Sequence, residues 1–99
     1  MSPPSVTTKI AQGDGGRYAS LVSEFAVALG RAVEFARRRR GWTQEQLAER
    51  ADLNRGYLGA IERGERSAVS VESIVKLAVA LETKMSTLMA AAEEEMGKR

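Results

Sequence analysis

The chain of 99 residues contains no cysteine and no histidine. Without cysteine it cannot form a disulfide bond, offer a thiolate to a metal ion or use a sulfur nucleophile. Without histidine it lacks imidazole ligands and the commonest general base of enzymes. Carboxylates could still serve as acid, base or ligand, but the acidic residues are scattered among basic ones and form no spaced cluster. The sequence therefore predicts no enzyme, no metal site and no cofactor.

Long apolar runs are also missing. No stretch approaches the roughly 20 residues that a helix needs to span a bilayer. Residues 1–16 lack the basic segment and the apolar segment of a secretory signal. We therefore expect a cytoplasmic protein that does not contact a membrane. With 43% hydrophobic residues, a chain of this length is expected to form one domain around one core.

The formal net charge is +2, and its distribution is more informative than its size. Residues 31–66 hold nine arginines and six acidic residues, whereas residues 67–99 hold four basic and five acidic residues. Arginine can fork onto phosphates and guanine edges, so the basic centre is compatible with a nucleic-acid ligand. The asymmetry is modest and does not establish such a ligand by itself.

Hydrophobic periodicity divides the chain into helices. Both prolines and three of the nine glycines lie in residues 1–17, which predicts a flexible tail over residues 1–20. Apolar residues then recur every three or four positions and predict helices over 21–40, 44–51, 55–63, 71–82 and 85–95. Residues 96–99 are expected to be a second tail. No segment has the alternation of a strand, so we predict a single all-α domain of five helices over residues 21–95.

Two of these helices are short and lie next to each other. Thr43 and Gln46 have the spacing of a capping box, and Asn54 and Ser70 are good N-caps for the helices that follow them. Three residues, 52–54, separate the second helix from the third. Apolar positions fall at Leu47, Ala51, Leu53, Leu58 and Ile61. This spacing is typical of a helix-turn-helix, in which the first helix packs across the second and exposes the N-terminal half of the second.

Residues 41–49 (GWTQEQLAE) and 57–64 (YLGAIERG) resemble the phage-repressor-like (XRE) family of helix-turn-helix proteins. Residues 53–57 and 63–70 are most similar to the controller proteins of restriction–modification systems. The resemblance implies a lambda-repressor-like fold, transcriptional regulation, and binding of a pseudopalindromic operator by a homodimer. Asp52 stands where the family usually has glycine, so we expect it to adopt a left-handed conformation. The loop after Arg66 also lacks the family's usual proline.

The helix-turn-helix assigns roles to exposed residues. Arg55 begins the third helix and is expected to read a base in the major groove of double-stranded DNA, because arginine on guanine is the commonest specific contact. Gly56 has no side chain, so it would permit close approach of the backbone to the DNA; alternatively, it is a glycine that the helix tolerates at this position. At the start of the second helix, the free backbone N–H groups and the positive end of the helix dipole are expected to bind a DNA phosphate. The remaining predicted DNA contacts are Thr43, Gln44, Tyr57, Arg63 and Arg66.

Several of these positions have an alternative role. Tyr57 could instead brace its helix as a half-buried ring. The arginine run 37–40 is expected to be a solvated cluster in which about one residue touches DNA, and Trp42 is expected to pack on the core. Glu62 is expected to face away from the bases and to hold a neighbouring arginine. A homodimer is predicted through an apolar patch made of Val79, Leu81, Met85, Leu88 and Met89, although Met85, Leu88 and Met89 could be core residues.

Two other functions fit the same fold. An antitoxin would bind both an operator and a toxin protein, and the long N-terminal tail could serve the toxin. A helical protein-interaction adaptor would not bind DNA, but Thr43, Gln44, Arg55 and Arg66 at exposed positions argue against it. No small-molecule ligand is expected.

Overall fold

The computed structural model describes residues 15–98, with side chains from residue 18 onward. This range forms five α-helices and no strand: α2 (Gly15–Arg39), α3 (Gln44–Ala51), α4 (Arg55–Glu62), α5 (Val71–Ala80) and α6 (Met85–Gly97). The all-α fold of five helices is confirmed. Across these residues, no helix combines the length and the hydropathy that a membrane span requires.

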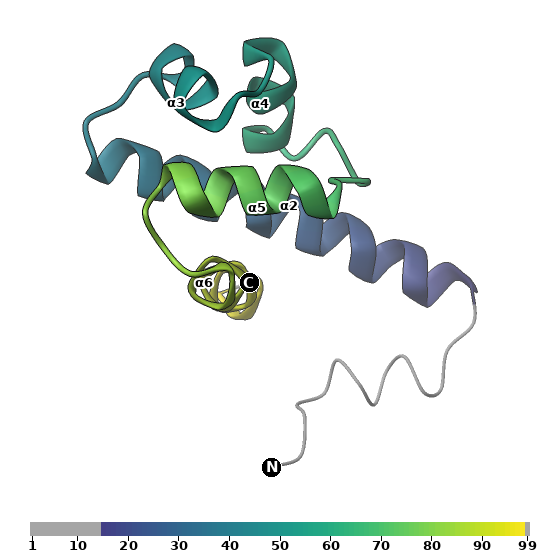
Figure 1. Cartoon of the computed structure of the whole chain (residues 1–99). Coiled ribbons are helices and arrows are strands. Elements are labelled where there is room, and N and C mark those ends of the chain that lie inside the picture. Colours follow the sequence, from purple (N-terminus) through teal and green to yellow (C-terminus); the bar gives the residue numbers. More distant parts are fainter. Residues whose placement is uncertain (1–14, 99) are drawn as a thin grey trace.

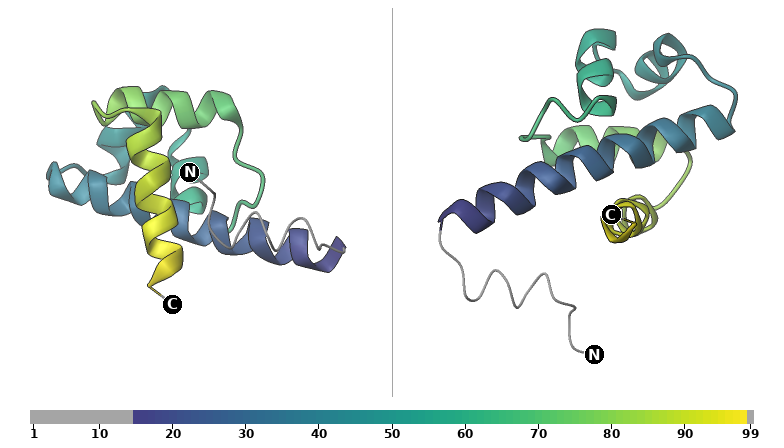
Figure 2. Two further views of the ribbon diagram at one scale, coloured as in Figure 1. Left: turned by 90° about the horizontal axis from the view of Figure 1, so that it is seen from below. Right: turned by 180° about the vertical axis from the view of Figure 1, so that it is seen from behind.

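The helices are arranged in three layers. Figure 1 shows α3 and α4 on one side, α2 and α5 in the middle, and α6 on the other side. Figure 2 shows that α2 is the longest element and that its N-terminal end extends beyond the other helices, while α6 crosses it. The short helices α3 and α4 therefore form one outer face of the molecule, which leaves them accessible to a ligand.

The core lies between α2 and the other four helices, all of which contribute buried side chains. Its most deeply buried side chains come from four helices and from the residue after α5; they are Val33, Leu47, Leu58, Ile61, Leu77 and Leu81. The axes of α2 and α4 approach closely at Gly30, where an added Cβ would collide with the carbonyl oxygens of Ile61 and Glu62. Glycine at this position therefore sets the distance between α4 and the long helix.

The three predicted N-caps are confirmed in detail. The side chains of Thr43, Asn54 and Ser70 each accept a hydrogen bond from a backbone N–H three residues later. Each satisfies one of the N–H groups that a helix leaves unpaired at its N-terminus. The chain then leaves α2, α3, α4 and α5 through a left-handed residue after each helix; these residues are Gly41, Asp52, Gly64 and Glu82. The caps thus fix both the length and the exit direction of the short helices.

Three predicted boundaries differ from the structure by two residues or more. The first helix begins at Gly15 rather than at residue 21, because Tyr18 continues the three-to-four-residue spacing of Leu21, Val22 and Phe25. Residues 1–14 of the predicted tail lie outside the described residues. The last helix continues to Gly97 because Met96, four residues after the buried Ala92, packs against the core. The fourth helix ends at Ala80 rather than at residue 82, because Glu82 has φ +57° and turns the chain away.

Candidate nucleic-acid interface

The turn between α3 and α4 depends on Asp52. This residue has φ 55° and ψ 48°, so the predicted left-handed conformation is confirmed. Its N–H donates to the carbonyl of Glu49 (3.2 Å), and the N–H of Leu53 donates to the carbonyl of Ala48 (2.8 Å). These bonds close the end of α3 and direct the chain into Asn54, whose Oδ1 accepts from the Tyr57 N–H at 3.1 Å. The start of α4 is therefore held in place by two backbone bonds and by the side-chain cap of Asn54.

The N-terminus of α3 carries the predicted capping box. The N–H of Gln46 donates to Oγ1 of Thr43 (3.1 Å), and the N–H of Thr43 donates to Oε1 of Gln46 (2.8 Å). Both residues are exposed. The other first-turn N–H groups of α3 still point out of the helix end, where an anion is favoured by the helix dipole.

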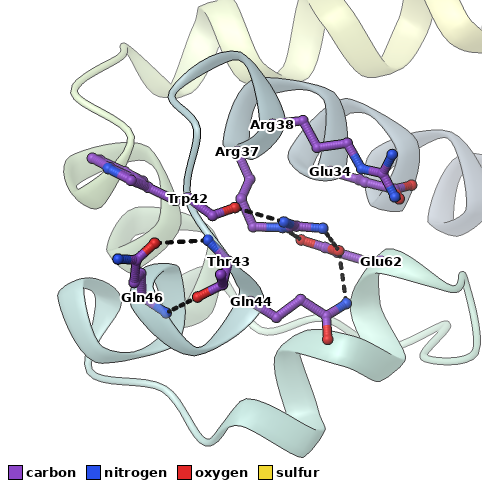
Figure 3. Close-up of polar contacts among 8 residues, drawn as sticks. All are labelled: Glu34, Arg37, Arg38, Trp42, Thr43, Gln44, Gln46 and Glu62. Atoms are coloured by element: carbon purple, nitrogen blue, oxygen red, sulfur yellow. Dashed lines mark hydrogen bonds and ion pairs between the residues drawn. The ribbon is translucent and has the colours of Figure 1, made fainter.

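A buried polar cluster joins α2, α3 and α4 (Figure 3). The Arg37 guanidinium donates from Nε to Oε2 of Glu62 (2.7 Å), from Nη2 to Oε1 of Glu62 (2.9 Å), and from Nη1 to the carbonyl of Trp42 (2.7 Å). The Gln44 amide donates from Nε2 to Oε1 of Glu62 at 2.9 Å. The hydrogen bonds to Glu62 raise the pKa of Arg37 above its usual value, so the guanidinium stays protonated inside the protein.

This cluster corrects two expectations. Arg37 is not part of a solvated run: its side chain is 9% exposed, and that of Glu62 is 2% exposed. Arg38 and Arg40 do lie at the surface, paired with Glu34 and Glu82. Glu62 holds an arginine, as expected, but that arginine lies 25 residues away in the sequence rather than next to it. The Gln44 side chain is only partly free for a phosphate, because one of its N–H groups already serves Glu62.

The exposed side of α4 begins with Arg55 and Gly56. The structure assigns the Arg55 side chain no hydrogen bond or ion pair with any residue that it describes. A Cβ at Gly56 would lie 3.1 Å from Oδ1 of Asn54, so a larger residue would crowd the cap of α4. The first turn of α4 thus offers an unpaired guanidinium beside a position without a side chain.

Tyr57 braces α4 against α5. Its ring is half-buried, and its hydroxyl lies 3.1 Å from Oγ of Ser73. Ser73 in turn contacts Oγ of Ser70 at 2.9 Å. On the outer side, the Arg66 guanidinium lies 5.1 Å from the centre of the Tyr57 ring. Tyr57 therefore has the bracing role, and it also gives Arg66 a surface to stack on.

Trp42 packs on the core, as predicted. Its outer face is covered by the guanidinium of Arg50 at 4.1 Å and approached by that of Arg40 at 5.5 Å. An aromatic ring covered by arginines is not open for stacking on a base, which agrees with its assignment as a core residue.

Arg63 is exposed at the end of α4 and pairs with Glu65 at 2.9 Å. The hydrogen bonds between the two side chains raise the pKa of Arg63 and lower the pKa of Glu65. Sequence reasoning assigned Arg63 to DNA and overlooked its acidic partner. The sequence contained a signal for this pair. Glu65 follows Arg63 by two residues with Gly64 between them, and a tight turn at the glycine brings the two side chains together.

The predicted dimer patch is only partly at the surface. Leu81 and Leu88 are buried in the core of the protomer, at 2% and 3% exposure, so they cannot contact a second copy. Val79 and Met85 are exposed, and Met89 is half-buried. Two further valines, Val71 and Val75, are exposed on α5 at the spacing i, i+4, i+8 with Val79. The apolar surface is therefore centred on α5 rather than shared evenly with α6.

Comparison with known proteins gives consistent results. The model of the helix-turn-helix family matches residues 33–88. The restriction–modification controller protein C.AhdI from Aeromonas hydrophila has a structure with a TM-score of 0.61 and 40% identity, covering 64% of this chain and 94% of that chain. The clp gene regulator ClgR from Corynebacterium glutamicum has a TM-score of 0.71 and 31% identity, covering 75% of this chain and 78% of that chain.

Two curated proteins are similar over shorter ranges. Control protein C.SmaI from Serratia marcescens is 45% identical over 47 residues, which is 48% of this chain and 55% of that protein. The HTH-type transcriptional regulator SlrR from Bacillus subtilis is 33% identical over 60 residues, which is 61% of this chain and 40% of that protein. The chain thus spans about half the length of these curated relatives.

Proposed function

The chain belongs to the helix-turn-helix family, and from this premise we propose that it is a sequence-specific DNA-binding transcriptional regulator. In this proposal it binds a pseudopalindromic operator as a homodimer, in the cytoplasm. The observation that carries the proposal is the Arg55 guanidinium at the exposed start of α4, which has no hydrogen-bond or ion-pair partner among the described residues. An unpaired arginine in the first turn of such a helix suits a guanine edge, because its two parallel N–H donors match the O6 and N7 acceptors.

The other exposed residues have supporting roles in this proposal. Thr43 and the remaining donor of Gln44 would bind a phosphate at the N-terminus of α3. Gly56 would allow the backbone of α4 to approach the bases, and Tyr57 would contact a sugar or phosphate with its ring edge. Phosphate contacts are also assigned to Arg63 and Arg66. No catalytic step, cofactor or small-molecule ligand is part of the proposal.

Within this family we propose a controller protein of a restriction–modification system. The support is the 40% identity to the C.AhdI controller over 94% of that chain, together with the 45% identity to control protein C.SmaI over its matched part. Regulated expression of an adjacent endonuclease gene would test this narrower assignment. A regulated gene set that contains no endonuclease would contradict it and leave DNA binding intact.

Replacement of Arg55 tests the main proposal. A cognate duplex is first selected from a random library with the wild type, and both it and a scrambled duplex are titrated at one salt concentration. Arg55→Ala should lose about 1–3 kcal/mol of binding free energy per half-site on the cognate duplex and much less on the scrambled duplex. Arg31→Ala, which removes the same charge from an exposed site on α2, is the control. Equal losses on both duplexes would make Arg55 a phosphate contact and contradict base readout.

We further propose that the homodimer forms through Val71, Val75 and Val79 of α5 together with Met85 and Met89. An apolar row along one helix suits a two-fold interface, in which the same surface is used by both copies. Val79→Asp should convert the dimer to a monomer in sedimentation at micromolar concentration. Val79 is 71% exposed, so the fold should survive the change. Val22→Asp on α2 is the matched control, and a wild type that stays monomeric would contradict the proposal.

A further inference from the structure

The turn after α4 fixes the backbone of Glu65. The N–H of Gly64 donates to the carbonyl of Ile61 (3.0 Å), and the N–H of Glu65 donates to the carbonyl of Ala60 (2.9 Å). These two bonds, with Gly64 at φ +74°, form a Schellman motif. A Cβ at Gly64 would lie 2.9 Å from Cγ2 of Val27, so the turn is also packed against α2. Glu65 is thus returned to the side of Arg63 by a rigid turn rather than by a flexible loop.

The two side chains meet in a bidentate arrangement. Arg63 donates from Nε to Oε2 of Glu65 (2.9 Å) and from Nη2 to Oε1 (3.2 Å). Exposed ion pairs usually contribute little, but a bidentate arginine–carboxylate pair on a fixed backbone is the favourable case. Both side chains are more than half exposed, so the pair lies where a ligand can reach it.

The rest of the Arg63 guanidinium lies across α4. Its Nη1 is 3.1 Å from the position that a Cβ would take at Gly59, and Oε1 of Gln44 is 3.5 Å from the same point. Gly59 therefore leaves the space in which the guanidinium lies close to the first residue of α3. Because Glu65 occupies Nε and one N–H of Nη2, the N–H groups of Nη1 and the second N–H of Nη2 are the donors that remain for DNA.

We propose that Glu65 is a specificity-determining residue for the DNA binding proposed above, and that it acts by restraining Arg63. An unrestrained arginine binds any phosphate, and such contacts dominate non-specific affinity. Pairing with Glu65 offsets this attraction and holds the guanidinium in one orientation. The penalty falls on DNA that does not match this orientation, so Glu65 lowers non-specific affinity more than operator affinity. This inference rests on the proposed function.

A double-mutant cycle tests it. The wild type, Glu65→Gln, Arg63→Ala and the double variant are titrated with the selected cognate duplex and with the scrambled duplex at several salt concentrations. Glu65→Gln should raise affinity for the scrambled duplex by about two- to fivefold, with a smaller rise on the cognate duplex. The log–log salt dependence on the scrambled duplex should steepen by up to about 0.9, the value for one more phosphate contact. In the Arg63→Ala background, Glu65→Gln should change little.

The cycle separates restraint from simple repulsion between Glu65 and DNA. Glu49→Gln is the control, because it removes one exposed carboxylate from α3 and Glu49 has no ion-pair partner among the described residues. The proposal is overturned if Glu65→Gln leaves both duplexes unaffected, if Glu49→Gln has the same effect, or if the effect persists without Arg63. A wild type that binds no duplex would overturn the proposed function as well, whereas the other outcomes leave that function standing.

Discussion

Two carboxylates three residues apart, Glu62 and Glu65, each form a bidentate pair with an arginine, yet their surroundings are opposite. Glu62 pairs with Arg37 inside the protein, where three helices meet and the carboxylate is 2% exposed. Glu65 pairs with Arg63 at the surface, where the carboxylate is 57% exposed. In the interior, loss of one partner leaves an unpaired charge away from water, whereas at the surface water replaces it. The same chemistry therefore stabilises the fold at one site and is free to influence a ligand at the other.

The largest expected effect comes from breaking the inner pair. Glu62→Gln should lower the free energy of unfolding by about 3–5 kcal/mol, because the Arg37 guanidinium remains buried without a counter-charge. Chemical denaturation measures the loss. Glu65→Gln is the matched control, since it makes the same change at the surface and should lower the denaturation midpoint far less. Similar stabilities of the two variants would show that burial does not distinguish the pairs.

A smaller effect is expected when the inner pair is replaced as a whole. Arg37→Met with Glu62→Leu removes both charges together, and such exchanges are often close to neutral. The double variant should recover most of the stability that Glu62→Gln loses. It should still bind the cognate duplex more weakly than the wild type, because Gln44 no longer has the Glu62 carboxylate to hold its amide. Denaturation and DNA titration of the same preparation separate the two contributions; unchanged DNA affinity would show that Glu62 does not position Gln44.

The local features of the fold could be predicted from the sequence. Periodicity and short-range chemistry were sufficient for the caps at Thr43, Asn54 and Ser70, because each depends on residues within about four positions. The left-handed Asp52 was predicted from the family resemblance, since this turn position is usually glycine in the family. The burial of Arg37 could not be predicted in this way. Four consecutive arginines cover all sides of a helix. Which of them is buried depends on where α4 packs against α2, and this is a long-range contact. Position 37 does follow the buried Val33 by four residues, which is the signal that was available.

The candidate site was predictable to a similar extent. The exposure of Arg55 follows from its position in the first turn of α4, which is a local property. The assignment of Leu81 and Leu88 to a dimer surface failed because apolar spacing is the same for a protomer core and for an interface. Which of the two applies depends on long-range packing, here on α6 crossing α2, because Leu88 on α6 and Leu81 after α5 lie in the one core of the protomer. The ion pair between Arg63 and Glu65 was missed because it depends on the conformation of the turn at Gly64.

A third ion pair extends the comparison to an almost fully exposed carboxylate. Breaking it is expected to change the free energy of unfolding least. Asp52 pairs with Lys76 at 3.6 Å, with its carboxylate 95% exposed. Asp52→Gly removes this pair, but Lys76 keeps its bonds to the main-chain carbonyl of residue 52 (3.2 Å) and to Glu72 (3.4 Å). It also removes the cost of a left-handed conformation for a residue with a Cβ, roughly 1–2 kcal/mol, against about 0.5–1 kcal/mol for the greater flexibility of glycine in the unfolded chain.

Since the exposed pair contributes little, Asp52→Gly should stabilise the protein by about 0.5–1 kcal/mol, measured by chemical denaturation. Asp52→Ala is the control, because it loses the carboxylate and keeps the Cβ in the left-handed conformation. It should be less stable than the wild type. If Asp52→Gly were destabilised as much as Asp52→Ala, the carboxylate would matter more than the backbone conformation. The strength of an ion pair at this surface would then not follow from its exposure, and the contrast between Glu62 and Glu65 would need another cause.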